Sequence, residues 1–103
     1  MKTRRELLED FVAQDPDDPF SRYALALELE KEGNDLGAVP QLQEVIVRDP
    51  SYVAAYYHLG RLLAKTGLLD EARDVYRRGL VAATDANDQR ARSEIQEALE
   101  TLE

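Results

Sequence analysis

Apolar positions along the chain recur at helical spacing, and no segment alternates apolar and polar residues cleanly in twos. In the first such segment, Leu7, Leu8, Phe11 and Val12 form a stripe of the kind that an amphipathic helix buries on one face. Residues that start or stop helices separate the segments. The pattern predicts six helices, over 3–14, 18–32, 36–48, 51–65, 70–83 and 87–102.

The helix ends carry recognisable signals. Thr3 followed by Glu6 is typical of a capping box at the start of the first helix. Gly33 and Gly67 can adopt the positive φ that closes a helix in a tight turn. Pro40 lies close to the start of the third helix, where it would cost a hydrogen bond if that helix began at residue 36. We therefore expect the third helix to begin near Gly37 or to bend at the proline.

The chain repeats itself with a period of 34 residues. Sliding residues 15–48 onto residues 49–82 gives nine identities, against about two expected by chance at average composition. The identities fall on turns, small packing residues and core leucines. Short connections favour antiparallel neighbours, so the second to fifth helices form two hairpins of equal period. The second helix is apolar on more than one side, which requires the cover of a stacked array.

These residues resemble the tetratricopeptide repeat family, whose pattern is an aromatic, Leu-Gly, a large residue, Ala, an aromatic and Pro. The second repeat matches at Tyr56, Leu59, Gly60, Leu63, Ala72 and Tyr76. The first repeat matches less fully, at Arg22, Leu25, Ala26, Leu29, Ala38, Leu42 and Pro50. The resemblance implies an all-α fold, a right-handed α–α superhelix of stacked hairpins in a single domain over 1–103. Within it lie an N-terminal helix at 3–14, repeats at 17–50 and 51–84, and a capping helix at 87–102.

Two departures from the family pattern affect the expected packing. Arg22 stands where an aromatic residue is expected, which predicts looser packing there. Thr84 replaces the closing proline of the second repeat, so the register of the sixth helix is left open. That helix groups apolar residues on one face, with polar residues elsewhere that suit a solvent-facing cap. The polar set is Gln89, Arg90, Ser93, Gln96, Glu97, Glu100 and Glu103.

Charge and composition exclude several function classes. Acids outnumber bases 21 to 13, and a net charge of −8 argues against general binding of nucleic acid or anionic membranes. The acid excess lies at the two ends, with −5 over residues 1–35, +1 over 36–84 and −4 over 85–103. The absence of cysteine excludes disulfide frameworks, zinc ribbons and thiol chemistry. We find no signal peptide or membrane-spanning run, so we expect a soluble cytoplasmic protein.

No constellation of residues indicates catalysis. His58 is the single histidine and has no serine or cysteine beside it, so we interpret it as structural. Asp15, Asp17 and Asp18 lack the glycine and distal glutamate of a calcium loop, and they suit helix capping and turns better. We therefore predict no enzyme activity, no catalytic residue, no metal and no cofactor.

The resemblance implies a protein–protein interaction module. In the family, the first helix of each hairpin lines a concave groove that holds an extended peptide or a partner helix. Carried over by repeat position, the implied contact set is Phe20, Tyr23, Leu27, Lys31, Tyr57, Arg61 and Lys65, and Arg92 and Ile95 close the groove if the sixth helix keeps the repeat register. Tyrosine and arginine are frequent interface anchors. The lysine and asparagine set that grips chaperone-tail carboxylates in some members is absent at the matching positions.

Alternatives to this groove remain open. Tyr23 and Tyr57 could instead pack between repeats, and for Phe20 and Leu27 an ordinary core role is favoured. The protein could also be a structural, homo-oligomerising array that pairs weakly through its first or sixth helix and has no separate ligand.

Overall fold

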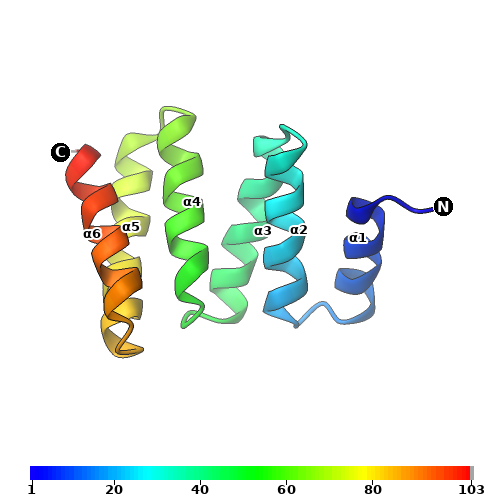
Figure 1. The fold of residues 1–103 in the computed structure, drawn as a ribbon, viewed down its shortest axis with the longest axis horizontal. Coiled ribbons are helices and arrows are strands. Elements are labelled where there is room, and N and C mark those ends of the chain that lie inside the picture. The colour runs from blue at the N-terminus through cyan, green and yellow to red at the C-terminus, as the bar shows by residue number, and fades with distance from the viewer. Residues whose placement is uncertain (103) are drawn as a thin grey trace. The chain divides into compact units, whose positions relative to one another are not determined.

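The structure, a computed structural model, describes residues 1–102, which contain six α-helices and no strand (Figure 1). The helices are α1 Arg4–Gln14, α2 Pro19–Lys31, α3 Asp35–Arg48, α4 Val53–Lys65, α5 Leu69–Asp85 and α6 Gln89–Leu102. The chain divides into two compact units, Met1–Asp49 and Pro50–Glu103, and each is described by itself below. No helix in the described part of the chain is both long and apolar enough to cross a bilayer.

The first unit consists of α1 and the antiparallel hairpin of α2 and α3 (Figure 1). The predicted capping box is confirmed, since Thr3 Oγ1 accepts from the Glu6 N–H at 3.1 Å and Glu6 Oε1 accepts from the Thr3 N–H at 3.0 Å. Two ion pairs join α1 to α2, from Arg4 to Glu28 at 3.3 Å and from Arg5 to Glu32 at 3.1 Å. The buried apolar side chains of this unit are Leu8, Leu25, Ala26, Leu29, Ala38, Leu42, Val45 and Ile46.

The start of α3 contradicts one of the two outcomes expected from Pro40, the late beginning near Gly37, while a bend at the proline stays a prediction. The helix begins at Asp35 rather than near Gly37, because the side chain of Asn34 caps it by accepting from the Gly37 N–H at 2.9 Å. Pro40 lies inside the helix, where it cannot donate to the carbonyl of Leu36. Both residues are exposed, so water can satisfy that carbonyl.

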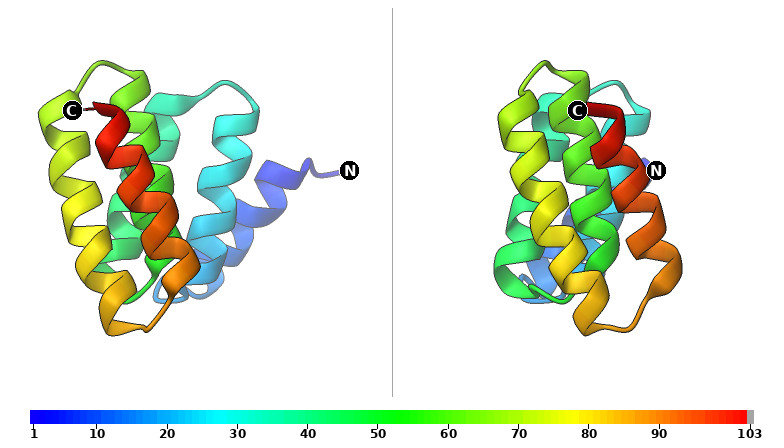
Figure 2. Two further views of the ribbon diagram at one scale, coloured as in Figure 1. Left: turned by 60° about the vertical axis from the view of Figure 1, so that its left-hand side comes forward. Right: turned by 90° about the vertical axis from the view of Figure 1, so that its left-hand side faces the viewer.

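The second unit consists of the antiparallel hairpin of α4 and α5 with α6 packed against both (Figure 2). Its core includes Tyr76 from α5 and the α6 residues Ile95 and Leu99, all buried. The polar residues predicted for the outer side of α6 are exposed, which confirms a polar cap, although Glu103 lies outside the described residues.

The helix α5 runs to Asp85, two residues beyond the predicted end, because Thr84 does not stop it. At the matching position after α3, Pro50 follows an extended Asp49 with φ −140° and ends the repeat. Thr84 instead donates its hydroxyl to the Leu80 carbonyl at 2.8 Å and stays helical. As a result α6 begins at Gln89, later than the 34-residue period would place it.

Three turns share one geometry. Gly33 and Gly67 have φ values of 83° and 87°, which confirms their predicted role, and Asn87 has a φ of 57°. The next residue in each case donates its N–H to the carbonyl five positions earlier, in the pairs Asn34–Leu29, Leu68–Leu63 and Asp88–Ala83. The turn from α5 to α6 therefore copies the turn inside each hairpin, not the proline-containing link that follows α1 and α3.

Arg22 takes over a bond that Tyr56 makes 34 residues later. The Tyr56 hydroxyl donates to the Pro50 carbonyl at 2.6 Å, and Arg22 Nη2 donates to the equivalent Pro16 carbonyl at 3.0 Å. Arg22 Nη1 also donates to Gln41 Oε1 at 3.2 Å, whereas its buried Nε has no hydrogen-bond partner. The arginine thus preserves the contact with the repeat boundary while leaving one of its own donors unsatisfied.

Candidate functional site

A pocket of about 260 Å³ lies between α4 and α6 in the second unit. Figure 2 shows α6 running beside α4. The pocket is lined by Val53, Ala54, Tyr57 and His58 from α4, by Asp88 from the turn before α6, and by Arg90, Ala91, Glu94 and Ile95 from α6.

The interior of the pocket is apolar. Ile95 is fully buried, and Val53 and Tyr57 pack against the cluster that it forms with Tyr76 and Leu99. Two alanines, an exposed one at 54 and a partly buried one at 91, leave the space open. A cavity of about 150 Å³ holds a benzene-sized ring, whereas drug-sized ligands need about 300–1,000 Å³. The pocket therefore has the size for a single aliphatic or aromatic side chain.

Charged groups on α6 line the polar side of the pocket. Asp88 Oδ1 accepts from the Ala91 N–H at 3.0 Å and so caps the start of α6. Arg90 Nε lies 3.4 Å from Glu94 Oε1, and both side chains are largely exposed. An exposed pair of this kind contributes little to stability and separates easily, so both groups can rearrange around a ligand.

His58 is held by an arginine one turn further along α4. Its Nδ1 lies 3.3 Å from Arg61 Nη2, and the ring packs edge-on against Tyr57 with centroids 5.5 Å apart. Because a guanidinium can only donate, we assign Nδ1 of His58 as the acceptor and place the ring proton of the neutral form on Nε2. Across residues 1–102, no three His, Asp or Glu side chains gather closely enough to hold a metal ion.

Tyr76 connects the pocket to the core beneath it. Burial raises the pKa of its hydroxyl, the nearby Tyr57 adds to the rise, and the Arg61 guanidinium opposes it. Tyr57 packs against the buried cluster of Tyr76, Ile95 and Leu99, so this part of the α4 face rests on the packed interior of the unit.

The predicted α4 residues lie on one side of their helix. Tyr57, Arg61 and Lys65 follow one another at four-residue spacing, which places them within about 80° around the axis. Tyr57 lines the pocket, Arg61 is partly buried beside it, and Lys65 is exposed near the helix end. The structure also brings Ile95 to the pocket. Tyr57, Arg61 and Lys65 therefore form a stripe that leads away from the pocket along α4.

Arg92 lies elsewhere on α6. Together with Leu80 and Val81 of α5, Arg92 borders a separate depression of about 240 Å³. The arginine that lines the pocket between α4 and α6 is Arg90. The 34-residue period, applied across the second repeat, missed Asp88, Arg90 and Glu94, because the Asn87 turn changes the entry into α6. A contact of Arg92 with a partner stays a prediction.

The predicted residues of the first unit share one side of α2. Phe20, Tyr23, Leu27 and Lys31 lie within about 80° of one another around the helix. Phe20 is 63% exposed, so the favoured interpretation of it as an ordinary core residue is wrong. Tyr23 and Leu27 are partly buried, and Lys31 is exposed.

Known proteins resemble the chain in sequence and in fold. Residues 23–88 match the family model described as "Tetratricopeptide repeat". The TPR repeat-containing protein PA0015 of Pseudomonas aeruginosa is 30% identical over 98 residues, which cover 95% of this chain and 93% of that protein. The chain is also 33% identical over 79 residues to human DnaJ homolog subfamily C member 3, but it spans only 16% of that protein's length.

Two solved structures extend the likeness. The crystal structure of a tetratricopeptide repeat domain protein from Salinibacter ruber has 40% identity and a TM-score of 0.79, covering 82% of this chain and 94% of that one. The solution structure of BPP2914 from Bordetella parapertussis has 31% identity and a TM-score of 0.82, covering 99% and 89%. These matches confirm the family resemblance and the all-α helical-repeat fold class predicted from the sequence.

Proposed function

Because this chain belongs to the tetratricopeptide repeat family, whose members are in general protein-interaction modules, we propose that it binds a peptide segment of a partner protein. The observation that carries the proposal is the pocket between α4 and α6, which is apolar inside and has the volume of one side chain. In the proposed complex, an aliphatic or aromatic side chain of the partner enters beside Ala54 and packs on Tyr57 and Ile95.

The remaining contacts follow α4 away from the pocket. Arg61 and Lys65 lie one and two turns beyond Tyr57 and supply positive charge to the same stripe. Arginine and tyrosine are enriched among residues that dominate binding energy. The α2 stripe of Phe20, Tyr23, Leu27 and Lys31 is the second proposed contact surface, with Arg92 a further candidate. Since an anchor of one side chain is small, we expect weak, transient binding.

The proposed activity is binding and not catalysis. The ionisable groups that line the pocket are Tyr57, His58, which is engaged by Arg61, and the exposed Asp88, Arg90 and Glu94. Asp88 caps the start of α6 and Glu94 is paired with Arg90, so both carboxylates already have structural roles.

The test fills the pocket without disturbing the core. Peptides enriched from a random display library on the wild-type protein are titrated against Ala54→Gln and against Ala13→Gln, the same change on the exposed surface of α1. We expect Ala54→Gln to weaken binding by about tenfold or more, because a long side chain occupies the site of the incoming one. Ala13→Gln should bind like the wild type. Equal affinities for all three proteins would refute the pocket as the anchor.

A further inference from the structure

The helix α1 occupies the place of the second helix of a repeat. Residues 34 positions apart match along it, since Leu8 corresponds to the buried Leu42 and Phe11 to the buried Val45. The helices also end alike: Asp15 donates its N–H to the Phe11 carbonyl at 3.0 Å, and Asp49 donates to the Val45 carbonyl at 2.8 Å. Both capping residues have a φ of −140° and precede a proline. The helix α1 is therefore built as half of a hairpin.

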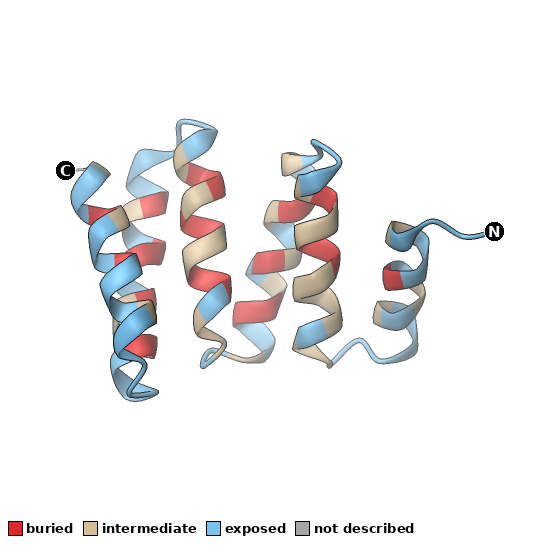
Figure 3. Ribbon diagram, viewed as in Figure 1, coloured by how far each residue is buried: buried red, intermediate tan, exposed pale blue. Residues whose placement is uncertain are grey.

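One side of α1, which we call the open face, consists of Arg4, Leu7 and Phe11, and all three residues are exposed. Figure 3 shows that most of α1 is exposed. Leu7 is 46% exposed and Phe11 is 52% exposed. The positions of α3 and α5 that match Arg4 and Phe11 are all buried: Ala38, Val45, Ala72 and Gly79. In α5, Tyr56 of the first helix of the same hairpin covers this side at Gly79. The open face thus presents side chains at positions that the repeat normally buries against a helix.

The second repeat shows what kind of helix fits such a face. Gly79 is the position that matches Phe11, and an added Cβ there would lie 2.7 Å from Cβ of Tyr56 on the facing helix. A large side chain on one helix therefore packs against a residue without a side chain on the other. On α1 the bulk is Phe11 itself. A complementary helix must therefore present a glycine or alanine opposite Phe11, with apolar neighbours one turn away toward Leu7.

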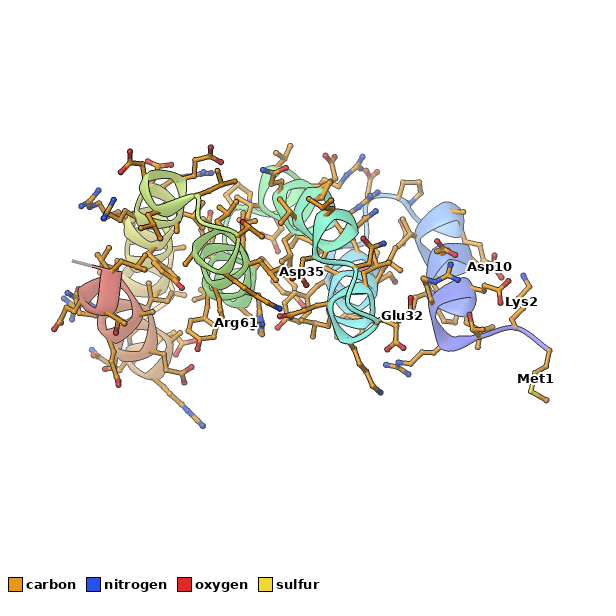
Figure 4. All side chains as sticks on the ribbon, turned by 90° about the horizontal axis from the view of Figure 1, so that it is seen from above. Met1, Lys2, Asp10, Glu32, Asp35 and Arg61 are labelled. Atoms are coloured by element: carbon orange, nitrogen blue, oxygen red, sulfur yellow. The ribbon has the colours of Figure 1, made fainter. Side chains whose placement is uncertain are left out.

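The net charge of the first unit indicates the charge of the partner helix. The first unit carries twelve acids and six bases, a net charge of −6. The basic residues of α1 and of the segment before it are engaged in ion pairs: Lys2 with Asp10 (Figure 4), Arg4 with Glu28, and Arg5 with Glu9 and Glu32. Arg4, the charged residue of the open face, is paired with Glu28, so the acid excess of the unit as a whole favours a cationic partner.

The size of the open face argues against a symmetric pairing of two copies. The 11 residues of α1 span about 16 Å and present only two large apolar side chains outward. A stable dimer buries about 800 Å² on each partner. We propose that the open face of α1 docks a basic amphipathic helix of a partner protein, with a small residue of that helix over Phe11 and apolar residues over Leu7.

The experiment uses two synthetic helical peptides of about 15 residues, near the length at which an isolated helix becomes stable. Both carry leucine and alanine on one face, and their other face is lysine in the first peptide and glutamate in the second. Fluorescence anisotropy measures binding to the full chain, to the double variant Leu7→Ser with Phe11→Ser, and to Val47→Ser. Val47 is a matched control, since it is 72% exposed on α3 of the same unit and its change also leaves the charge unaltered.

We expect the lysine peptide to bind the wild type and Val47→Ser alike, and to lose about tenfold or more in affinity for the double variant. The glutamate peptide should bind markedly more weakly. Equal binding to the double variant would mean that the lysines merely adhere to an acidic surface, and the proposal would be wrong. Absence of binding to the wild type, or equal binding of the glutamate peptide, would also overturn it. Self-association of the wild type that disappears in the double variant, without peptide binding, would assign the open face to a second copy instead.

Discussion

The ring of Tyr76 on α5 lies against the bare backbone of Gly60 on α4, where an added Cβ would come within 2.6 Å of the ring atom Cδ1. The reverse arrangement occurs one turn away, where Tyr56 of α4 covers Gly79 of α5. The α4–α5 hairpin therefore packs through two tyrosine–glycine pairs of opposite direction. Each tyrosine ring fits only because the residue that it faces has no side chain. The residue at position 76 is therefore tied to the residue at position 60, and the residue at position 56 to the residue at position 79.

Replacing Gly60 by alanine should destabilise the second unit. Alanine favours the helix by about 1 kcal/mol, but a rigid buried ring has to move, and overpacking of this kind costs about 1–3 kcal/mol. We expect a net loss of about 1 kcal/mol in the free energy of unfolding, measured by urea denaturation.

The first repeat supplies the control for this substitution. At the matching positions it carries Ala26 and Leu42, both buried, so a smaller side chain faces the alanine. The double variant Gly60→Ala with Tyr76→Leu recreates that pair. Its destabilisation should be smaller than the sum of the two single changes by about 0.5 kcal/mol or more. Strict additivity would show that the ring and the glycine are not coupled.

Tyr56→Phe tests the hydrogen bond from Tyr56 to the carbonyl of Pro50, where the first repeat ends. The substitution removes the hydroxyl that donates to the Pro50 carbonyl at 2.6 Å but keeps the ring over Gly79. A lost hydrogen bond of this type costs about 0.5–1.5 kcal/mol, so the urea midpoint should fall while the helical circular dichroism of the folded protein is unchanged. An unaltered midpoint would mean that water replaces the hydroxyl at no cost.

Most of the fold could be predicted from the sequence because its signals are local. The capping box at Thr3 and the turns at Gly33 and Gly67 depend on residues within one turn of a helix, and such interactions survive in any packing arrangement. The start of α3 was missed because two local signals compete there. The side-chain cap from Asn34 gains a hydrogen bond, and the loss at Pro40 falls on an exposed carbonyl.

The candidate site was predictable only in part. Tyr57 and Ile95, which both line the pocket, follow from the family's repeat positions carried over to this sequence. Ala54 was missed because its contribution is the volume that it leaves empty, which no chemical signal reports. Asp88 and the α6 residues Arg90 and Glu94 depend on the turn at Asn87, where a non-glycine residue adopts positive φ. The 34-residue period carries no information about such a turn.

Alkaline pH should destabilise the second unit through Tyr76. Burial raises the pKa of its hydroxyl above the ordinary value of about 10, so in this range the folded state holds a proton that the unfolded state releases. The stabilisation is complete below pH 10 and is lost as pH rises through the higher folded-state pKa. Tyr76→Phe should flatten the fall of the unfolding free energy between about pH 9.5 and 11. Parallel pH profiles for the two proteins would contradict this assignment.

The attachment of α1 to α2 should weaken in high salt. The ion pairs Arg4–Glu28 and Arg5–Glu32 join the two helices, and of the apolar residues of α1 only Leu8 is buried. Partly exposed pairs contribute up to about 1 kcal/mol each and are screened when the Debye length falls to about 3 Å at 1 M salt. Hydrogen exchange at the amides of α1 should therefore accelerate by about threefold to tenfold between 0.05 and 1 M sodium chloride. The amides of α5, where the core is apolar, serve as the internal control and should change little. Equal acceleration in both helices would show that salt acts on the whole fold and not on these two ion pairs.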